Sequence, residues 1–287
     1  MNAPTILVTG AGGQVGHELA RLLPARGAVV AVDRSQLDLG DADALRSTMR
    51  SVKPQIVVNA AAYTAVDRAE EERELAFAVN GRGPAVLAEE AKRLGALLVH
   101  YSTDYVFDGR ATAPYAEEAP TAPLNVYGAS KLAGEQGIVQ SGCAHLILRT
   151  SWVYASRGRN FLLTVRRLAA EREELKIVAD QFGVPNWARS ISEATSRLVA
   201  LGASRLAERG GVYHLSAAGQ ATWFDFARAI LGPVERPRVV AITTAQYPTP
   251  ARRPAYAVLS TTKFRQTFGF ALPDWRLVLE ECLAARD

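Results

Sequence analysis

A tyrosine and a lysine stand four residues apart in the segment Tyr127-Gly-Ala-Ser-Lys131. Four residues span about one helical turn, so a helix here would direct both side chains to the same face. An ammonium group close to a phenol favours the phenolate, and the pair therefore predicts a tyrosine whose pKa is lowered toward neutrality. Such a phenol is a suitable acid for the reduction of a carbonyl group. The same spacing also arises by chance on exposed helix faces, so the interpretation needs support from other segments.

Three glycines near the N-terminus predict a binding site for the phosphates of a dinucleotide. Gly10, Gly13 and Gly16 follow the apolar segment Thr5–Thr9 and precede a helical pattern of leucines. Glycine lets the backbone turn tightly beside a pyrophosphate, and the next helix presents its N-terminal N–H groups to the anion. The spacing GxxGxxG differs from the common GxGxxG because Val15 stands where the last glycine of that pattern would fall. A tight turn without a ligand is the alternative.

Asp33 ends the second predicted strand about 20 residues after the glycines, where a carboxylate that binds the adenine ribose is expected. A carboxylate there favours NAD, whereas Arg34 beside it is a candidate partner for the additional phosphate of NADP. NADPH and NADH therefore both stay open as cofactors, and Arg34 is equally well explained as a solvated loop cation. Asp38 and Leu39 in the following loop are expected close to the adenine.

Strands and helices alternate through the first half of the chain. Apolar segments at residues 5–9, 28–32, 55–58, 96–101 and 145–148 predict strands, with helical patterns between them. This alternation predicts an α/β fold of the Rossmann type, built on a doubly wound parallel sheet. We expect residues 1–150 to form the dinucleotide-binding domain and residues 151–287 to form mainly a smaller α/β lobe for the substrate. Segments around 191–215, which include a predicted helix from Ile191 to about Ala207, are candidates to return to the first sheet.

The fourth predicted strand ends in His100-Tyr-Ser-Thr-Asp104. Because ligands bind at the carboxyl ends of parallel strands, Ser102 and Thr103 are candidate hydroxyl groups for the site. A simple turn at a strand end is the alternative. The helix with Tyr127 follows after a polar loop, which would allow hydroxyl, phenol and ammonium groups to meet.

These motifs together resemble the extended short-chain dehydrogenase/reductase family. Longer segments resemble the dTDP-4-dehydrorhamnose reductases within that family, and they occur in both halves of the chain. They are Gly13-Gln-Val-Gly16, Asn59-Ala-Ala-Ala-Tyr-Thr-Ala-Val-Asp67, His100-Tyr-Ser-Thr-Asp-Tyr-Val-Phe107, Pro123-Leu-Asn-Val-Tyr-Gly128, Arg149-Thr-Ser-Trp-Val-Tyr154 and Tyr247-Pro-Thr-Pro-Ala-Arg-Arg-Pro254.

The resemblance implies reduction of the 4-keto group of dTDP-4-dehydro-β-L-rhamnose, the last step in the synthesis of dTDP-β-L-rhamnose. It implies that Tyr127 gives a proton to the developing alkoxide, that Lys131 holds the nicotinamide ribose, and that Thr103 bonds the same oxygen. The implied cofactor contacts, besides Tyr127 and Lys131, are Gly10, Gly13, Gln14, Val15, Gly16, Asp33, Arg34, Asp38, Leu39, Ala62, Tyr63, Thr64 and Tyr101. The implied substrate contacts are Thr103, Asp104, Trp152, Arg252 and Arg253. Core packing for Trp152 and a solvated pair for the two arginines are the alternatives.

Two other functions stay open on the same fold. A sugar epimerase or 4,6-dehydratase would return the hydride to its substrate, although such dehydratases typically carry an Asp-Glu pair where Asp104 is followed by Tyr105. A non-catalytic regulatory subunit that binds a dinucleotide is the other alternative. By resemblance to metal-bridged dimers, Mg²⁺ and a homodimer are further expectations, but no carboxylate cluster in the sequence supports a metal site.

The composition predicts a cytoplasmic globular protein whose ligand is a small molecule, here a sugar nucleotide. The 287 residues are 48% hydrophobic, and the net charge of +4 is mild and dispersed. No basic stripe with interleaved aromatic residues indicates nucleic-acid binding, and no long apolar segment or leader indicates a membrane span. The two cysteines, Cys143 and Cys282, lack metal-ligand spacing, which is typical of a reducing compartment.

Overall fold

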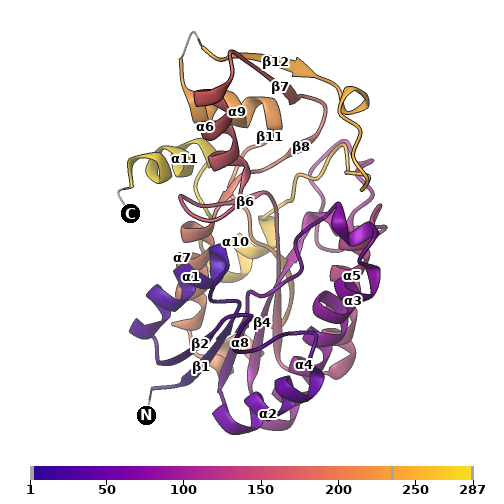
Figure 1. Ribbon diagram of the computed structural model, residues 1–287. Coiled ribbons are helices and arrows are strands. Elements are labelled where there is room, and N and C mark those ends of the chain that lie inside the picture. Colours follow the sequence, from indigo (N-terminus) through magenta and orange to yellow (C-terminus); the bar gives the residue numbers. More distant parts are fainter. Residues whose placement is uncertain (1–2, 234–235, 286–287) are drawn as a thin grey trace.

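A six-stranded parallel sheet forms the centre of the larger part of the molecule (Figure 1). The computed structural model describes residues 3–233 and 236–285, so the outermost residues of both predicted domains and positions 234–235 lie outside the described residues. The strand order is β10-β5-β4-β3-β1-β2, and every neighbouring pair is parallel. The strands are β1 (Thr5–Thr9), β2 (Ala28–Val32), β3 (Ile56–Asn59), β4 (Leu97–Thr103), β5 (His145–Thr150) and β10 (Gly211–His214). The predicted α/β fold with a Rossmann-type sheet is confirmed.

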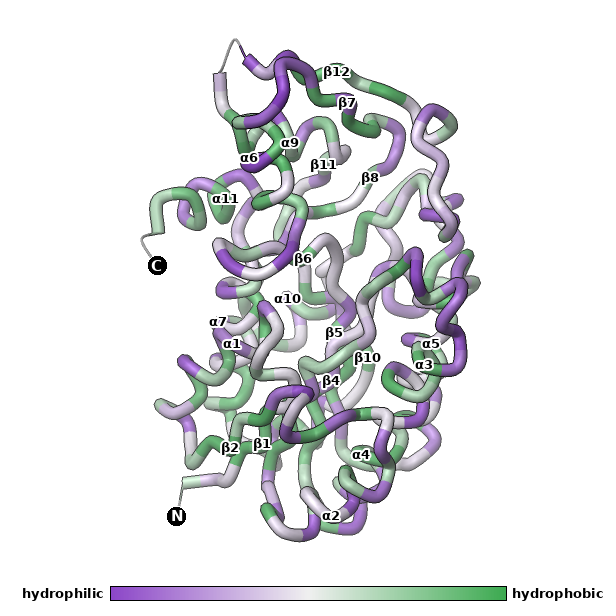
Figure 2. The backbone as a smooth tube through the Cα atoms, viewed as in Figure 1, coloured by the Kyte–Doolittle hydropathy of each residue, from purple (hydrophilic) through white to green (hydrophobic). Residues whose placement is uncertain are grey.

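The central strands are apolar on both faces because helices cover both sides of the sheet. Every residue of β3 and β4 is buried. Successive residues of β1 alternate between the two cores, with Ile6 and Val8 in one and Leu7 in the other. Figure 2 shows the hydrophobic segments along these strands and hydrophilic segments on the outer turns of the helices around them.

One face of the sheet is covered by α1 and α7, and the opposite face by α2, α4 and α5. These helices are α1 (Gln14–Leu22), α2 (Ala42–Val52), α4 (Gly83–Leu94), α5 (Val126–Ser141) and α7 (Ala188–Val199), with α3 (Arg73–Phe77) and a π-helical turn (Ala78–Arg82) before α4. Short 3-10 helices lie at Leu23–Ala25, Arg68–Glu70, Asp104–Val106 and Thr244–Gln246. In Figure 1, the carboxyl ends of the strands face the part of the molecule that contains α6 (Phe161–Glu171), α9 (Trp223–Leu231) and α11 (Trp275–Ala284).

A smaller lobe lies beyond those strand ends and has a separate core. Three two-stranded pairings support it: β7 with β12, β8 with β11, and β6 with β9. Its strands are β6 (Val153–Tyr154), β7 (Glu174–Val178), β8 (Phe182–Gly183), β9 (Asn186–Trp187), β11 (Ala221–Thr222) and β12 (Arg238–Ile242). Helices α6, α9 and α11 pack around Trp275 and Phe226, while α10 (Thr262–Phe268) packs on the main sheet.

The segment that we expected as one helix from Ile191 to about Ala207 is divided, and this prediction was wrong. Helix α7 ends at Val199, and α8 (Ala203–Ala207) starts after a turn. Gly202 within that turn has φ +88°. This left-handed backbone cannot continue an α-helix, and glycine is the residue that adopts it without a steric penalty.

After the first strands of the smaller lobe, the chain returns to the main sheet with α7 and β10. Strand β10 pairs with β5, with Val212 opposite Ile147, and α7 packs against α1. The chain therefore passes from the sheet to the smaller lobe and back. The division near residue 150 stays a prediction. Within the described part of the chain, no helix is long and apolar enough to cross a bilayer.

Candidate functional site

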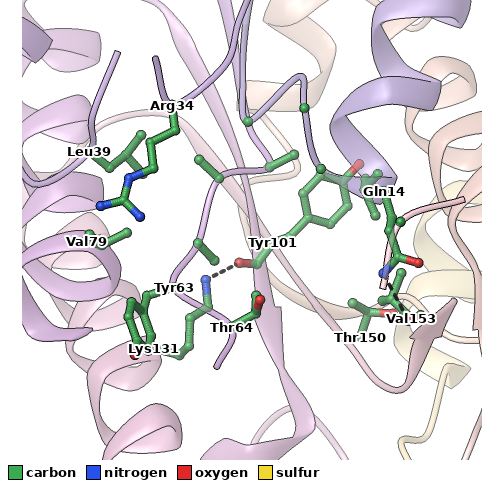
Figure 3. Close-up of a pocket in the computed structure, with 18 of the residues that line it drawn as sticks. Gln14, Arg34, Leu39, Tyr63, Thr64, Val79, Tyr101, Lys131, Thr150 and Val153 are labelled. Carbon is green, nitrogen blue, oxygen red and sulfur yellow. Dashed lines mark hydrogen bonds between the residues drawn. The ribbon is translucent and has the colours of Figure 1, made fainter. Parts of the chain in front are cut away.

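A pocket of about 490 Å³ opens at the carboxyl ends of the central strands, between the sheet and the smaller lobe. Its wall is formed by the glycine turn after β1, the loops after β2 and β3, the end of β4, helix α5, and the segment from Thr150 to Arg159. Figure 3 shows Arg34 and Leu39 on one side of this pocket and Gln14, Thr150 and Val153 on another, with Tyr101 between them. Carboxyl ends of strands in such sheets are the usual place for ligands.

Most of the predicted cofactor contacts line this one pocket. Those that do are Gly10, Gly13, Gln14, Val15, Arg34, Asp38, Leu39, Ala62, Tyr63, Thr64, Tyr101, Tyr127 and Lys131. The pocket lining does not include Gly16, Asp33, Thr103, Asp104, Trp152, Arg252 or Arg253. The structure thus gathers the glycine turn and the Tyr-Lys pair in one cavity, and it places most predicted substrate contacts outside that cavity.

The glycine turn is held by close backbone contacts that a side chain would prevent. A Cβ on Gly10, whose φ is +74°, would lie 2.6 Å from the Ala61 nitrogen. One on Gly16 would lie 2.0 Å from the Gly10 oxygen, so Gly16 packs beneath the turn rather than beside the pocket. Gly12 has more room, with Asp33 Cβ at 3.5 Å, and it does line the pocket. Helix α1 begins at Gln14 without a side-chain cap, which suits an anion at its N-terminus.

The loop after β2 directs its cation, and not its first carboxylate, to the pocket. Asp33 accepts hydrogen bonds from the nitrogen and the hydroxyl of Ser35, at 2.8 and 2.6 Å, and these bonds lower the pKa of Asp33. Arg34 lines the pocket and lies 3.4 Å from Asp38, in an exposed ion pair. Asp33 therefore stays beside the glycine turn with its carboxylate occupied by its own loop.

Tyr127 and Lys131 both lie on the first turns of α5 and both line the pocket. Asn125 caps this helix by accepting a bond from the Gly128 nitrogen at 2.8 Å. Gly128 allows the helix to start against residues 104–106, because a Cβ there would lie 2.2 Å from the Tyr105 oxygen. The ring of Tyr127 packs edge-on against Tyr105, with centroids 5.7 Å apart.

The predicted lowering of the phenol pKa was wrong. Burial raises the pKa of Tyr127 to about 12, against the opposing effect of a hydrogen bond with Thr103. Lys131 donates instead to the Tyr101 carbonyl at 2.6 Å and lies 3.2 Å from His100 Nε2. Burial also lowers the pKa of Lys131 to about 8. Loss of water disfavours the charged form of both groups.

Lys131 contacts a buried polar network that we did not predict from the sequence. Thr9 donates to Asn59 Oδ1 at 2.7 Å, and the Asn59 amide lies 3.0 Å from His100 Nδ1. Burial, reinforced by the nearby Lys131 charge, lowers the pKa of His100 well below its ordinary value. His100 is therefore neutral, and its one unprotonated ring nitrogen can accept from either the Asn59 amide or Lys131, but not from both. The network joins β1, β3, β4 and α5 beneath the pocket floor.

The end of β4 contains a buried carboxyl beside the predicted hydroxyl. Thr103 donates to Asp104 Oδ1 at 2.9 Å and accepts from the Tyr105 nitrogen at 3.1 Å. Burial raises the pKa of Asp104 to about 7. Asp104 Oδ2, Ser102 Oγ and Thr150 Oγ1 are buried and have no hydrogen-bond partner among the described residues. Buried polar atoms normally find a partner, so these atoms fit a polar ligand at the strand ends.

Trp152 lies at the junction of the two lobes in a strained backbone conformation, with φ +41°. Its indole stacks on that of Trp223, with centroids 3.6 Å apart and planes at 10°. Gly183 leaves room for the ring, since a Cβ there would lie 2.5 Å from the Trp152 Cε2 atom. A strained non-glycine residue in such a place is typical of ligand sites.

The two predicted arginines have different environments. Arg253 forms a double ion pair with Asp67, at 2.8 and 3.0 Å, which lowers the pKa of Asp67. Arg252 is exposed, and its carbonyl accepts from the Asn125 amide at 2.8 Å. The loop at residues 247–254 is thus fastened to the first half of the chain through a charge that we had expected to be free for the substrate.

Several pocket residues were not predicted as contacts. They are Gly12, Leu37, Ala60, Ala61, Val79, Ser102, Thr150, Val153, Arg157, Gly158 and Arg159. Ser102 was predicted as a candidate hydroxyl group for the site without an assigned contact, and the same strand-end rule would have selected Thr150. No sequence signal marks the loop at 157–159. Over the described ranges, no three or more His, Cys, Asp or Glu side chains gather where they could hold a metal ion.

Comparison with known proteins relates this geometry to a family. The family model for the RmlD substrate binding domain matches residues 4–287. A curated dTDP-4-dehydrorhamnose reductase from Burkholderia thailandensis is 51% identical and covers 97% of each chain. The chain belongs to this reductase family.

Two other members of the family agree with that assignment. The dTDP-4-dehydrorhamnose reductase of Escherichia coli K12 is 43% identical, over 97% of this chain and 96% of that one. The crystal structure of the dTDP-4-dehydrorhamnose reductase from Bacillus anthracis in complex with NADP superposes with a TM-score of 0.92 at 35% identity, covering 99% of both chains. The family's sequence and fold therefore both extend over the whole described chain.

Proposed function

We propose that the chain reduces the 4-keto group of dTDP-4-dehydro-β-L-rhamnose to dTDP-β-L-rhamnose, with NADPH or NADH as the reductant. The observation that carries the proposal is the pocket in which the glycine turn, Tyr127 and Lys131 meet. Membership of the reductase family and the NADP of a related structure support the substrate and the class of cofactor.

The pocket residues fit a bound nicotinamide dinucleotide. The uncapped start of α1 suits the phosphates, and the unpartnered Ser102 and Thr150 hydroxyls suit polar groups further along the cavity. When bound, the nicotinamide supplies a hydride to the carbonyl carbon. The preference between NADPH and NADH depends in this proposal on Arg34, which faces the pocket, and on Asp33, whose carboxylate does not.

Tyr127 is the proposed proton donor. Its pKa of about 12 keeps the phenol protonated at neutral pH, as an acid requires. The developing alkoxide receives the proton of Tyr127 Oη. Thr103 is the second candidate donor, for which its hydroxyl proton has to turn away from Asp104 Oδ1. Lys131, fixed by the Tyr101 carbonyl and His100, orients the cofactor ribose and provides a cation below about pH 8.

Trp152, Asp104, Arg252 and Arg253 complete the proposal as substrate contacts. They lie on the strand ends and on the loop that joins the two lobes. Trp152 offers an indole face for the sugar or the base, and the two arginines offer guanidinium groups for a diphosphate. Asp104, with an unpartnered oxygen, offers a hydrogen bond to a sugar hydroxyl.

One assay tests the function. The protein is incubated with NADPH and dTDP-4-dehydrorhamnose, and nicotinamide oxidation and dTDP-rhamnose are measured together. We expect one nicotinamide oxidised for each product. An epimerase or dehydratase would alter the sugar without net oxidation, and a regulatory subunit would bind NADPH without turnover, so either result would refute the reductase assignment.

The variant Tyr127→Phe tests the proton donor. We expect kcat to fall at least about 100-fold, because the donor hydroxyl is lost while the ring packing against Tyr105 is kept. NADPH affinity should stay close to that of the parent in a fluorescence titration. The matched control is Tyr213→Phe, which removes a buried hydroxyl bonded to the Arg209 carbonyl, away from the pocket. Full activity in the Tyr127 variant would exclude the assigned role.

A further inference from the structure

The loop between β6 and α6 brings two cations to the pocket. Arg157, Gly158 and Arg159 all line the cavity, although they come from the smaller lobe and far from the glycine turn in sequence. Both arginine side chains are exposed at its mouth. Neither guanidinium forms an ion pair or a hydrogen bond within residues 3–233 and 236–285. Unpaired arginines that face a cavity are candidate partners for an anionic ligand.

This loop is fastened to the start of α1. The Asn160 amide donates to the Ala155 and Arg157 carbonyls, at 2.8 and 3.0 Å, which closes the loop. The same amide donates to Gln14 Oε1 at 2.8 Å, and Gln14 donates in turn to the Val153 carbonyl at 3.3 Å, a bond visible in Figure 3. The loop therefore lies beside the first residue of the helix that follows the glycine turn.

Gly158 allows the backbone of the loop to turn at this point. Its φ of +77° lies in the left-handed region that favours glycine. A Cβ at this position would lie 3.9 Å from Gln14 Cγ, so the backbone between the two arginines passes next to the glycine turn. The backbone positions of Arg157 and Arg159 are thereby held near the N-terminus of α1.

The other cations that line the pocket already have partners. Arg34 pairs with Asp38, and Lys131 donates to the Tyr101 carbonyl. The helix N-terminus offers only about half a unit charge, whereas the pyrophosphate of a dinucleotide carries two negative charges. Among the described lining residues, Arg157 and Arg159 are the cations that remain for that anion.

We propose that Arg157 and Arg159 bind the pyrophosphate of the dinucleotide beside the glycine turn, so that the smaller lobe supplies part of the cofactor site. The inference rests on the proposed function, since it takes a nicotinamide dinucleotide as the ligand. Binding of the cofactor then fastens the two lobes together through charge, in addition to the Gln14 and Asn160 bonds.

The test measures cofactor affinity rather than turnover. NADPH and NADH are titrated separately into the parent protein, Arg157→Gln, Arg159→Gln and the double variant, and the nicotinamide fluorescence is followed. An exposed ion pair contributes up to about 1 kcal/mol, so we expect up to about fivefold weaker binding for each single variant and a larger loss for the double variant. The loss should be equal for NADPH and NADH and should shrink at high salt.

Arg166→Gln is the matched control, because Arg166 is an exposed arginine on α6 that does not line the pocket. It should bind both cofactors as the parent does. Parent-like affinity in the double variant would overturn the inference. A loss of affinity confined to NADPH would assign the arginines to the additional phosphate of that cofactor. Weaker binding of dTDP with unchanged NADH affinity would assign them to the substrate. Either result would also overturn the inference. Failure of the parent itself to bind NADPH or NADH would instead refute the proposed function.

Discussion

Burial controls the ionisation of the residues around the end of β4. It raises the pKa values of Tyr127 and Asp104 and lowers that of Lys131, so all three are shifted toward their neutral forms. The spacing of Tyr127 and Lys131 correctly placed both side chains at one cavity, but the direction of the phenol shift could not be read from spacing. Desolvation depends on what packs around the pair, and Tyr101, His100 and Tyr105 come from other segments.

Asp104 gives a prediction about stability. Its folded pKa lies near 7, above the ordinary 3.8, so between these pH values the folded state binds more protons than the unfolded state. The free energy of unfolding therefore falls as the pH rises from about 4 to about 7. We expect Asp104→Asn to remove this decline. Above pH 7 the free energy of unfolding of the variant should exceed that of the parent by up to about 4 kcal/mol. Urea unfolding followed by circular dichroism measures both.

Asp108→Asn is the control of opposite sign. A hydrogen bond from Tyr115 lowers the pKa of Asp108, so its stabilisation is present at neutral pH and disappears as the pH falls through that lowered value. The Asp108 variant should be the less stable one at neutral pH. An Asp104 variant whose stability followed the same pH dependence as the parent would show that folding does not raise the pKa of Asp104.

At the scale of elements, two glycines of the turn are needed for different reasons: Gly16 for packing of the fold and Gly12 for ligand binding. Gly16→Ala would place a Cβ 2.0 Å from the Gly10 oxygen, so α1 would have to move away from the turn. We expect a loss of about 2 kcal/mol or more in the free energy of unfolding. Gly12→Ala has room in the fold, yet its methyl group enters the pocket wall, so we expect nearly parental stability and weaker NADPH binding.

Thermal unfolding and NADPH titration of both glycine variants check this difference. The interpretation fails when Gly16→Ala is as stable as the parent, or when Gly12→Ala binds NADPH as tightly as the parent does.

The elements themselves were largely predictable, because the central strands are continuous apolar segments and their helices repeat apolar residues at helical spacing. The break between α7 and α8 was not, since a single glycine within an apolar pattern does not show whether its φ is positive. The contact of the 157–159 loop with Gln14 was equally hidden. It depends on bonds between residues far apart in the chain, at positions with no motif.

At the scale of the whole molecule, Asp67 and Arg253 join the first half of the chain to the loop at 247–254. The pair is partly exposed, so its loss should cost about 1 kcal/mol or less in either Asp67→Ala or Arg253→Ala. The two variants should differ in KM for the sugar nucleotide, because Arg253 and not Asp67 is the proposed contact of the substrate diphosphate. We expect Arg253→Ala to raise KM for the sugar nucleotide by about tenfold, whereas Asp67→Ala should leave it unchanged or lower it.

Steady-state kinetics at saturating NADPH, with Arg252→Ala alongside, measure this difference. Equal KM values in the Asp67 and Arg253 variants would show that Arg253 acts only in joining the two halves. The sequence could identify Arg253 as a conspicuous cation near a predicted site. It could not show that Asp67, in a distant segment, already neutralises that charge.

The position of β10 has a consequence for synthesis on the ribosome. Strand β5 lies between β4 and β10, yet β10 follows only after residues that build much of the smaller lobe. A nascent chain that has emerged as far as Thr150 therefore presents β5 as an unpaired, apolar edge, the kind of surface on which strands of other chains add. Translation must continue through His214 before the chain can cover that edge with its own strand.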